Sequence, residues 1–170
     1  MRLLIVAIIA LIVLSGCRQD YSTVEKVELE KFMGDWYVIG ILPNAIEKHA
    51  VNGIESYRLN EDGTIGITYT FKKGTPDGKE KILTPKAKVF NHETNAEWRV
   101  QMFKPFWYPY LVVDLADDYR YTVIGVPNRK YVWIMSRTPD LAENDYQNIL
   151  AKLKHEGYNT EKIVKMPQIW

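Results

Sequence analysis

Short stretches in which apolar and polar residues alternate dominate the chain from Trp36 to Arg137. In residues 65–71 every second residue is apolar, and residues 86–89 and 97–102 repeat the pattern. A period of two places alternate side chains on opposite faces of a β-strand. Turn-forming sequences such as Asn60-Glu61-Asp62-Gly63 separate the stretches. We therefore predict eight antiparallel strands that form an up-and-down barrel or a sandwich.

A helical period replaces this alternation near the C-terminus. One apolar stripe is formed by Ala142, Tyr146, Ile149, Leu150 and Leu153. Thr138-Pro139 precedes the stripe and Gly157 follows it, which are start and stop signals for a helix. We predict one α-helix packed outside the sheet, followed by a short strand over residues 162–164.

The N-terminus has a basic residue, Arg2, and then an apolar run over Leu3–Leu14. These twelve residues are fewer than the roughly 20 needed to span a bilayer, so they predict a secretory leader. The following Ser15-Gly16-Cys17 completes a string that resembles the lipobox of bacterial lipoproteins. That resemblance implies cleavage before Cys17 and a diacylglycerol on its sulfur. The alternative is an ordinary leader that contains a cysteine at its cleavage site.

We accordingly divide the chain into a signal peptide (residues 1–16), an acylated Cys17 with its tether (17–26) and one domain (27–170). Two or more acyl chains anchor a protein stably to a membrane. Arg18 follows Cys17, whereas Asp at this place marks inner-membrane retention in enterobacterial lipoproteins. The resemblance therefore implies the periplasmic face of the outer membrane, for a Gram-negative host.

Composition excludes several classes of function. Lys plus Arg number 22 and Asp plus Glu number 21, which lacks the basic excess of nucleic-acid-binding proteins. One cysteine excludes an intramolecular disulfide and a cysteine-rich zinc site. The three histidines, His49, His92 and His155, have no metal-binding spacing. We therefore predict no metal, no cofactor and no nucleic-acid partner.

Three motifs occur in a distinctive order: Gly34-Asp35-Trp36 at the first strand, Asp117-Asp118-Tyr119 before the seventh, and Ser136-Arg137 before the helix. Together they resemble the lipocalin family, and specifically its bacterial outer-membrane branch, although Asp117 stands where the family has Thr. The resemblance implies an all-β fold, an eight-stranded up-and-down barrel with one C-terminal helix outside. It also implies structural roles for Gly34, Trp36, Asp118, Tyr119 and Arg137, with Arg137 stacked on Trp36 at the closed end.

If Trp36 and Arg137 both point inward, the period of two fixes which side chains face the interior. The predicted ligand-binding lining consists of Val38, Gly40, Glu55, Tyr57, Ile67, Tyr69, Phe71, Val89, Trp98, Val100, Met102, Tyr121, Tyr131 and Trp133. Residues 110–115 are apolar on both faces, so their orientation stays open. An eight-stranded barrel is either filled by its own side chains or holds one small ligand. The resemblance implies the second.

The loops predicted at the open end carry an excess of basic residues, among them Lys48, Lys79, Lys104 and Lys130. They either attract anionic head groups or are simply solvated. One of these loops, residues 104–109, contains the aromatic run Phe106-Trp107-Tyr108, which would touch a lipid, a bilayer or a second subunit, or fold back on the barrel. Glu55, charged among apolar neighbours, would hold a cationic amine or pair with a lysine.

The resemblance implies a membrane-anchored protein that binds, stores or transports a fatty acid or a lysophospholipid in the cell envelope. A homodimer is a further partner hypothesis. The alternatives are a structural envelope lipoprotein without a ligand and a lipid-modifying enzyme. The sequence contains no Ser-His-Asp order and no paired carboxylates on one strand, so we predict that the chain is not an enzyme.

Overall fold

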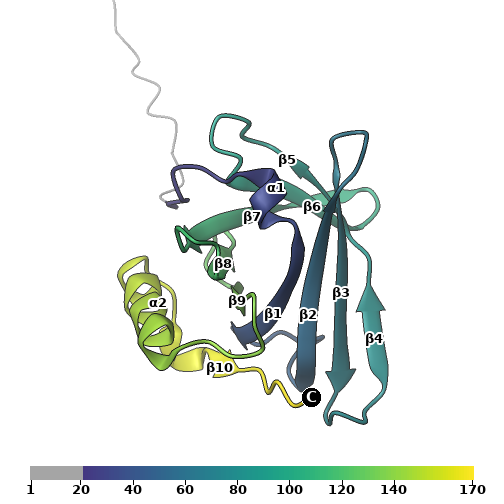
Figure 1. The fold of residues 1–170 in the computed structure, drawn as a ribbon, viewed down its shortest axis with the longest axis vertical. Coiled ribbons are helices and arrows are strands. Elements are labelled where there is room, and N and C mark those ends of the chain that lie inside the picture. Colours follow the sequence, from purple (N-terminus) through teal and green to yellow (C-terminus); the bar gives the residue numbers. More distant parts are fainter. Residues whose placement is uncertain (1–20) are drawn as a thin grey trace, which may run out of the picture.

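A computed structural model describes residues 21–170 (Figure 1). The predictions for the leader and for Cys17 concern residues outside this range. The described part contains helices α1 (Leu29–Phe32) and α2 (Glu143–His155) and a 3₁₀ turn, η1 (Thr160–Lys162). Its strands are β1 (Gly34–Ile41), β2 (Ala50–Leu59), β3 (Ile65–Lys73), β4 (Glu80–Leu83), β5 (Lys86–Val89), β6 (Glu97–Phe103), β7 (Phe106–Leu115), β8 (Tyr121–Gly125), β9 (Val132–Ser136) and β10 (Val164–Lys165).

The sheet closes into a barrel because β9 pairs back onto β1, with Val38 opposite Met135. Successive strands from β1 to β9 are antiparallel neighbours, except that β4 and β5 both pair with β3. These two short strands form one barrel strand interrupted at Pro85, which lacks the N–H that a ladder needs. Counted in this way the barrel has eight strands, as predicted, and the sandwich alternative is excluded.

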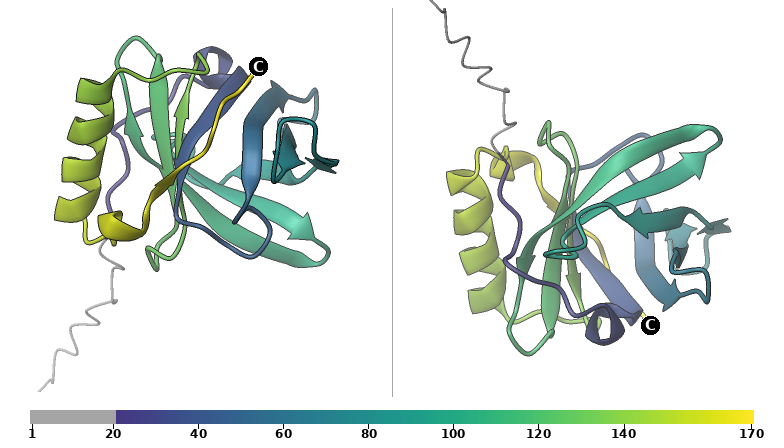
Figure 2. Two further views of the ribbon diagram at one scale, coloured as in Figure 1. Left: turned by 90° about the horizontal axis from the view of Figure 1, so that it is seen from below. Right: turned by 90° about the horizontal axis from the view of Figure 1, so that it is seen from above.

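Helix α2 packs against the outside of the barrel (Figure 2). Its apolar stripe buries Tyr146, Ile149 and Leu153 against residues of β7, β8 and β9. Gly157, at φ +85°, terminates it, since glycine adopts this conformation without steric cost. The predicted helix is thereby confirmed. Neither helix in residues 21–170 is long and apolar enough to span a bilayer.

The short helix α1, absent from the sequence prediction, covers the end of the barrel where β1 begins (Figure 1). Its buried Phe32 belongs to the barrel core. The opposite end, which carries the loops after β1, β3, β6 and β8, is the open end.

The C-terminal segment, residues 164–169, lies between β1 and β2 near the open end. Strand β10 pairs with β1, and the backbone N–H of Asn52 on β2 donates to Pro167 O at 2.8 Å. The segment also places Met166, 4% exposed, in the barrel core. The predicted last strand therefore exists, two residues later than expected.

Candidate ligand-binding site

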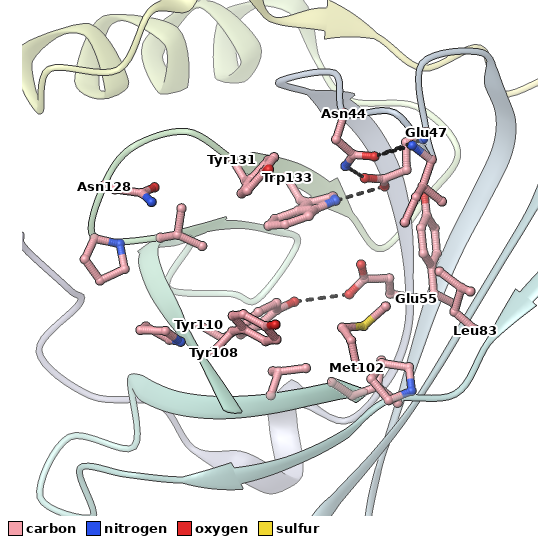
Figure 3. Close-up of a pocket in the computed structure, with 18 residues that line it drawn as sticks. Asn44, Glu47, Glu55, Leu83, Met102, Tyr108, Tyr110, Asn128, Tyr131 and Trp133 are labelled. Carbon is pink, nitrogen blue, oxygen red and sulfur yellow. Dashed lines mark hydrogen bonds between the residues drawn. The ribbon is translucent and has the colours of Figure 1, made fainter. Parts of the chain in front are cut away.

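A cavity of about 430 Å³ occupies the open half of the barrel (Figure 3). This volume falls in the range of small-molecule sites, roughly 300–1,000 Å³. Most of the wall is apolar or aromatic. The lining residues are Asn44, Ile46, Glu47, Glu55, Ile67, Tyr69, Leu83, Pro85, Val100, Met102, Tyr108, Pro109, Tyr110, Val126, Pro127, Asn128, Tyr131 and Trp133.

Aromatic side chains fill the closed half of the barrel. The Phe32 ring lies edge-on to Trp98, with ring centroids 5.2 Å apart, and to Tyr57 at 5.4 Å. Trp98 stacks on Tyr110 at 5.8 Å and donates from its indole nitrogen to Asn95 O at 2.7 Å. The barrel is thus filled at the closed end and hollow at the open end. The two alternatives from the sequence, a side-chain-filled interior and a ligand cavity, each describe one half.

Glu55 projects from β2 into the cavity (Figure 3), next to Tyr57 and Tyr110 of this aromatic cluster. Its Oε2 accepts hydrogen bonds from the hydroxyls of Tyr57 and Tyr110, the latter at 3.1 Å. The residue is only 6% exposed. Burial raises the pKa of Glu55 to about 7, against the lowering effect of the Tyr57 hydrogen bond and with a further increase from the charge of Glu47.

A second buried carboxylate, Glu47, lies in the β1–β2 loop and is 4% exposed. Its Oε1 accepts from the Trp133 indole N–H at 3.0 Å, and its Oε2 accepts from the Asn44 side-chain amide. The Asn44 Oδ1 in turn accepts from the backbone N–H groups of Ile46 and Glu47. This turn holds Glu47 against the cavity wall.

The hydroxyl of Tyr69 is buried at the cavity wall and has no hydrogen-bond partner among residues 21–170. Burial raises the pKa of Tyr69, so the phenol stays protonated. An unpaired buried hydroxyl is costly, and a ligand that hydrogen-bonds to it would remove the cost.

Half of the predicted lining lies on the cavity wall: Glu55, Ile67, Tyr69, Val100, Met102, Tyr131 and Trp133. Five more predicted residues are buried in the barrel core without lining the cavity. They are Val38, Tyr57, Phe71, Val89 and Trp98. Their inward orientation agrees with the alternation, but their neighbours leave no space beside them.

The prediction that Gly40 lines the interior is wrong. The pairing of β1 with β9 shifts register between Val38 and Gly40, and a bulge of this kind reverses the alternation beyond it. Val38 lies in the barrel core, whereas a Cβ on Gly40 would lie 3.3 Å from the Tyr146 hydroxyl of α2. Gly40 therefore faces the helix.

The prediction for Tyr121 is also wrong. Tyr121 and Val123 pack in the cluster beneath α2, whereas Ile124 packs in the barrel core. Because α2 covers this part of the sheet, both faces of β8 are buried, with Val123 on one face and Ile124 on the other. The alternation along β8 therefore does not indicate which face points into the barrel.

Several wall residues were not predicted. Tyr110 lies on β7, whose other face packs under α2 through Leu111 and Val113, so the apolar pattern there had no preferred face. Leu83 lies on β4, a strand that the alternation did not reveal. Asn44 and Glu47 come from a loop, where Asn is a usual turn former but nothing in the sequence indicates burial.

Phe106, Trp107 and Tyr108, predicted as a loop, begin strand β7 instead, with Phe106 opposite Phe103 of β6. Phe103 and Phe106 are 65% and 61% exposed. Trp107 folds back, with the Lys88 ammonium 4.6 Å from its ring centroid, and Tyr108 lines the cavity.

The predicted structural motifs meet at the closed end. The Arg137 guanidinium lies 3.6 Å from the ring centroid of Trp36 and donates to the carbonyls of Lys31, Phe32 and Asp35. Gly34 has a φ of +95°, and a Cβ there would lie 3.4 Å from Arg137 Nη1.

The turn before β8 completes this end. The Tyr119 hydroxyl accepts from the backbone N–H of Glu28 at 2.9 Å. Asp118 accepts from the backbone and guanidinium of Arg120, and these hydrogen bonds lower the pKa of Asp118. The contacts of Tyr119 and Arg137 join separate backbone segments and those of Asp118 fix the turn, so they support a structural role. Residues 21–170 contain no group of three His, Cys, Asp or Glu residues arranged to hold a metal.

Comparison with known proteins agrees with this geometry. Residues 27–168 match the lipocalin-like domain. The chain is 31% identical to temperature-induced lipocalin-1 of Arabidopsis thaliana over 163 residues, covering 89% of this chain and 84% of the relative. It is 28% identical to the outer membrane lipoprotein Blc of Vibrio cholerae over 168 residues, covering 95% of this chain and 96% of the relative.

Solved structures share the fold. Insecticyanin from the tobacco hornworm Manduca sexta superposes with a TM-score of 0.70 at 16% identity, covering 88% of this chain and 85% of that one. Apocrustacyanin C1 superposes with a TM-score of 0.68 at 17% identity, covering 84% and 81%. With the family match spanning most of its length, the chain belongs to the lipocalin family.

Proposed function

We propose that this protein is a membrane-anchored carrier that binds, stores or transports a fatty acid or a lysophospholipid in the bacterial cell envelope. The observation that carries the proposal is the cavity of about 430 Å³ with its mostly apolar wall. Membership of a family of ligand-binding carriers supports binding rather than catalysis.

The apolar wall suits an acyl chain. Ile67, Leu83, Val100 and Met102 present aliphatic and thioether groups to the cavity. Each buried methylene contributes about 0.8 kcal/mol, so a dozen methylenes offer about 10 kcal/mol before ordering costs. Such a sum commonly leaves an affinity on the micromolar scale.

The open end suits an anionic head group. The loops after β1, β3, β6 and β8 place Lys48, Lys79, Lys104 and Lys130 around the same end of the barrel. Glu47, although part of one of these loops, is buried at the cavity wall and so does not belong to the exposed rim. The exposed surface of these loops is therefore more basic than their amino-acid composition indicates.

Anchoring through Cys17 is supported by similarity to relatives named outer membrane lipoprotein Blc, from Vibrio cholerae and Escherichia coli. The chain joins the barrel soon after Cys17, since the backbone N–H of Val24 donates to Val112 O at 3.0 Å. An acylated Cys17 would therefore hold the carrier close to the membrane surface, on the periplasmic face in a Gram-negative host.

Mass spectrometry of protein purified from membranes tests both parts of the proposal. A lipid extract should contain a fatty acid or lysophospholipid in stoichiometric amount, and the N-terminal peptide should begin at an acylated Cys17. Turnover of added lysophospholipid would support an enzyme instead. Neither bound lipid nor turnover would support a structural lipoprotein with an unused cavity.

A substitution that narrows the cavity, compared with the same substitution outside it, tests whether the ligand binds in the cavity. Leu83→Trp adds bulk to the wall and should weaken palmitate binding about tenfold, because displacing two methylenes forfeits about 0.8 kcal/mol each. Isothermal titration gives the affinity. Leu59→Trp is the control, because Leu59 is 39% exposed at the closed end of β2 and should leave binding unchanged. Equal affinity in both variants would place the ligand outside the cavity.

A further inference from the structure

The charged groups on the cavity wall all have the same sign. Glu47 and Glu55 are buried there, and the lining includes no Lys, Arg or His. Figure 3 shows both carboxyl groups on the same side of the cavity, with Trp133 beside Glu47 and Tyr110 beside Glu55. A ligand group that reaches this depth therefore meets negative charge with no basic counter-charge on the wall.

Glu47 and Glu55 differ in how many of their carboxylate oxygens accept hydrogen bonds. Both oxygens of Glu47 accept hydrogen bonds, from Trp133 and Asn44. Both phenols that contact Glu55 reach the same oxygen, Oε2, and no hydrogen bond from residues 21–170 to its Oε1 is found. Oε1 of Glu55 is therefore an acceptor that no described residue supplies with a donor, on the same cavity wall as the Tyr69 hydroxyl.

A carboxylate of a ligand placed here would be buried beside two like charges, which is strongly unfavourable. An alkylammonium group has the opposite properties, since it carries three donors and a positive charge. Two aromatic side chains that can contribute cation–π attraction, Tyr110 and Trp133, line the same cavity.

We propose that the deep end of the cavity is a site for a primary ammonium group, so that the preferred ligand is a long-chain aliphatic amine with Glu55 as its counter-ion. This inference rests on the proposed function, since it assigns a ligand class to the same cavity. A fatty acid is then accepted in one orientation only, with its carboxylate at the basic rim and its methyl end toward Glu55.

The acid–base chemistry gives this proposal a distinctive pH dependence. The groups that face Glu55 are Tyr57, Tyr69 and Tyr110, whose pKa values are raised by burial so that all three stay neutral, and the carboxyl group of Glu47. Only the ionised form of Glu55 binds an ammonium, and its pKa is about 7. The ionised fraction rises about tenfold between pH 6 and pH 8, while an aliphatic amine stays protonated.

The test compares three probes of equal length on the full chain: dodecylamine, dodecanol and dodecanoic acid, each displacing a neutral fluorescent probe from the cavity. At pH 8 we expect the amine to bind at least tenfold more tightly than the alcohol, and the acid, held only at the rim, to bind less tightly than the amine. Between pH 6 and pH 8 the amine affinity should rise about tenfold and the alcohol affinity should not change.

Glu55→Gln keeps the shape of the side chain and removes its charge. In this variant the amine should lose its advantage and its pH dependence, while unchanged alcohol binding shows that the cavity is intact. Glu47→Gln should reduce the advantage by a smaller factor, because both Glu47 oxygens already accept hydrogen bonds.

The outcomes separate this inference from the proposed function. If the wild-type protein binds none of the three probes, the carrier proposal itself fails. If the alcohol or the acid binds as tightly as the amine at pH 8, or if Glu55→Gln retains the preference for the amine, the ammonium site is disproved and the carrier proposal stands.

Discussion

The carboxyl group of Glu55 lies beside two phenol rings and is 6% exposed, so burial disfavours its charged form. The alternation of β2 predicted that this side chain points inward, and it does. Its neighbours could not be predicted in the same way, because Glu47 belongs to an irregular loop and Tyr110 to a strand that is apolar on both faces. At the scale of single residues, the sequence therefore predicted the inward orientation of Glu55, whereas contacts with distant residues determine its hydrogen bonds and its pKa.

Glu55 should make the stability of the protein depend on pH. Its pKa is about 7 in the folded state, against 4.5 for an ordinary Glu, so the folded chain binds more protons between these values. The free energy of unfolding should then fall as pH rises from about 5 to 8, by about 3 kcal/mol in total. Urea denaturation at both pH values should show that Glu55→Gln removes this decrease.

Glu61→Gln is the matched control for this measurement. Glu61 is exposed in the β2–β3 turn, so its replacement should leave the pH profile as in the wild type. A profile that is unchanged in Glu55→Gln would mean that Glu55 is ionised throughout this range.

At the scale of elements, the errors in the prediction occur where a strand is covered on both sides or carries a bulge. Helix α2 covers the outer face of β8, so Val123 and Ile124 are both buried although they face opposite ways, and the half-buried Tyr121 lies under the helix with Val123. The bulge in β1 turns Gly40 toward α2. Where one face meets solvent, as on β3, the alternation gave Ile67 and Tyr69 correctly.

The hairpin of β6 and β7 presents two exposed rings beside the cavity mouth, which suits transfer of a lipid from a bilayer. Phe106→Ser should slow uptake of palmitate from phospholipid vesicles, by about threefold or more, while thermal unfolding stays unchanged, because a ring that is 61% exposed contributes little to packing. Stopped-flow fluorescence with a tryptophan-quenching fatty acid gives the rate.

Phe90→Ser is the control for the hairpin, since Phe90 is similarly exposed, at 57%, but follows β5 at the closed end. It should leave the uptake rate as in the wild type. Equal slowing in the two variants would show that general surface apolarity, and not the hairpin, determines uptake.

At the scale of the whole molecule, the C-terminal segment completes the barrel wall. Its residues bond both neighbouring strands: the backbone N–H of Met166 donates to Ile39 O at 2.8 Å, and the Gln168 side chain donates to the carbonyls of Val38 and Gly53. Asn52, in the left-handed region at φ 55°, holds the backbone of Ile169 through its amide. Together these contacts span the gap that β1 and β2 leave near the mouth.

Deletion of residues 164–170 should lower the free energy of unfolding by about 4 kcal/mol. Loss of the buried Met166 side chain removes about 2 kcal/mol, and each of several backbone hydrogen bonds contributes about 1 kcal/mol or less. Chemical denaturation measures the difference. Deletion of Trp170 alone, which is 69% exposed, should change stability by less than about 1 kcal/mol.

The sequence by itself determined the number of barrel strands, the position of the helix and the identity of the closed-end residues Gly34, Trp36 and Arg137. These features depend on local periodicity and on motifs, which a linear chain contains. Only the tertiary structure decided that the barrel is filled at one end and hollow at the other, and that Glu47 and Glu55 share one cavity. Packing space and the electrostatic environment depend on which distant side chains meet, and periodicity does not specify those contacts.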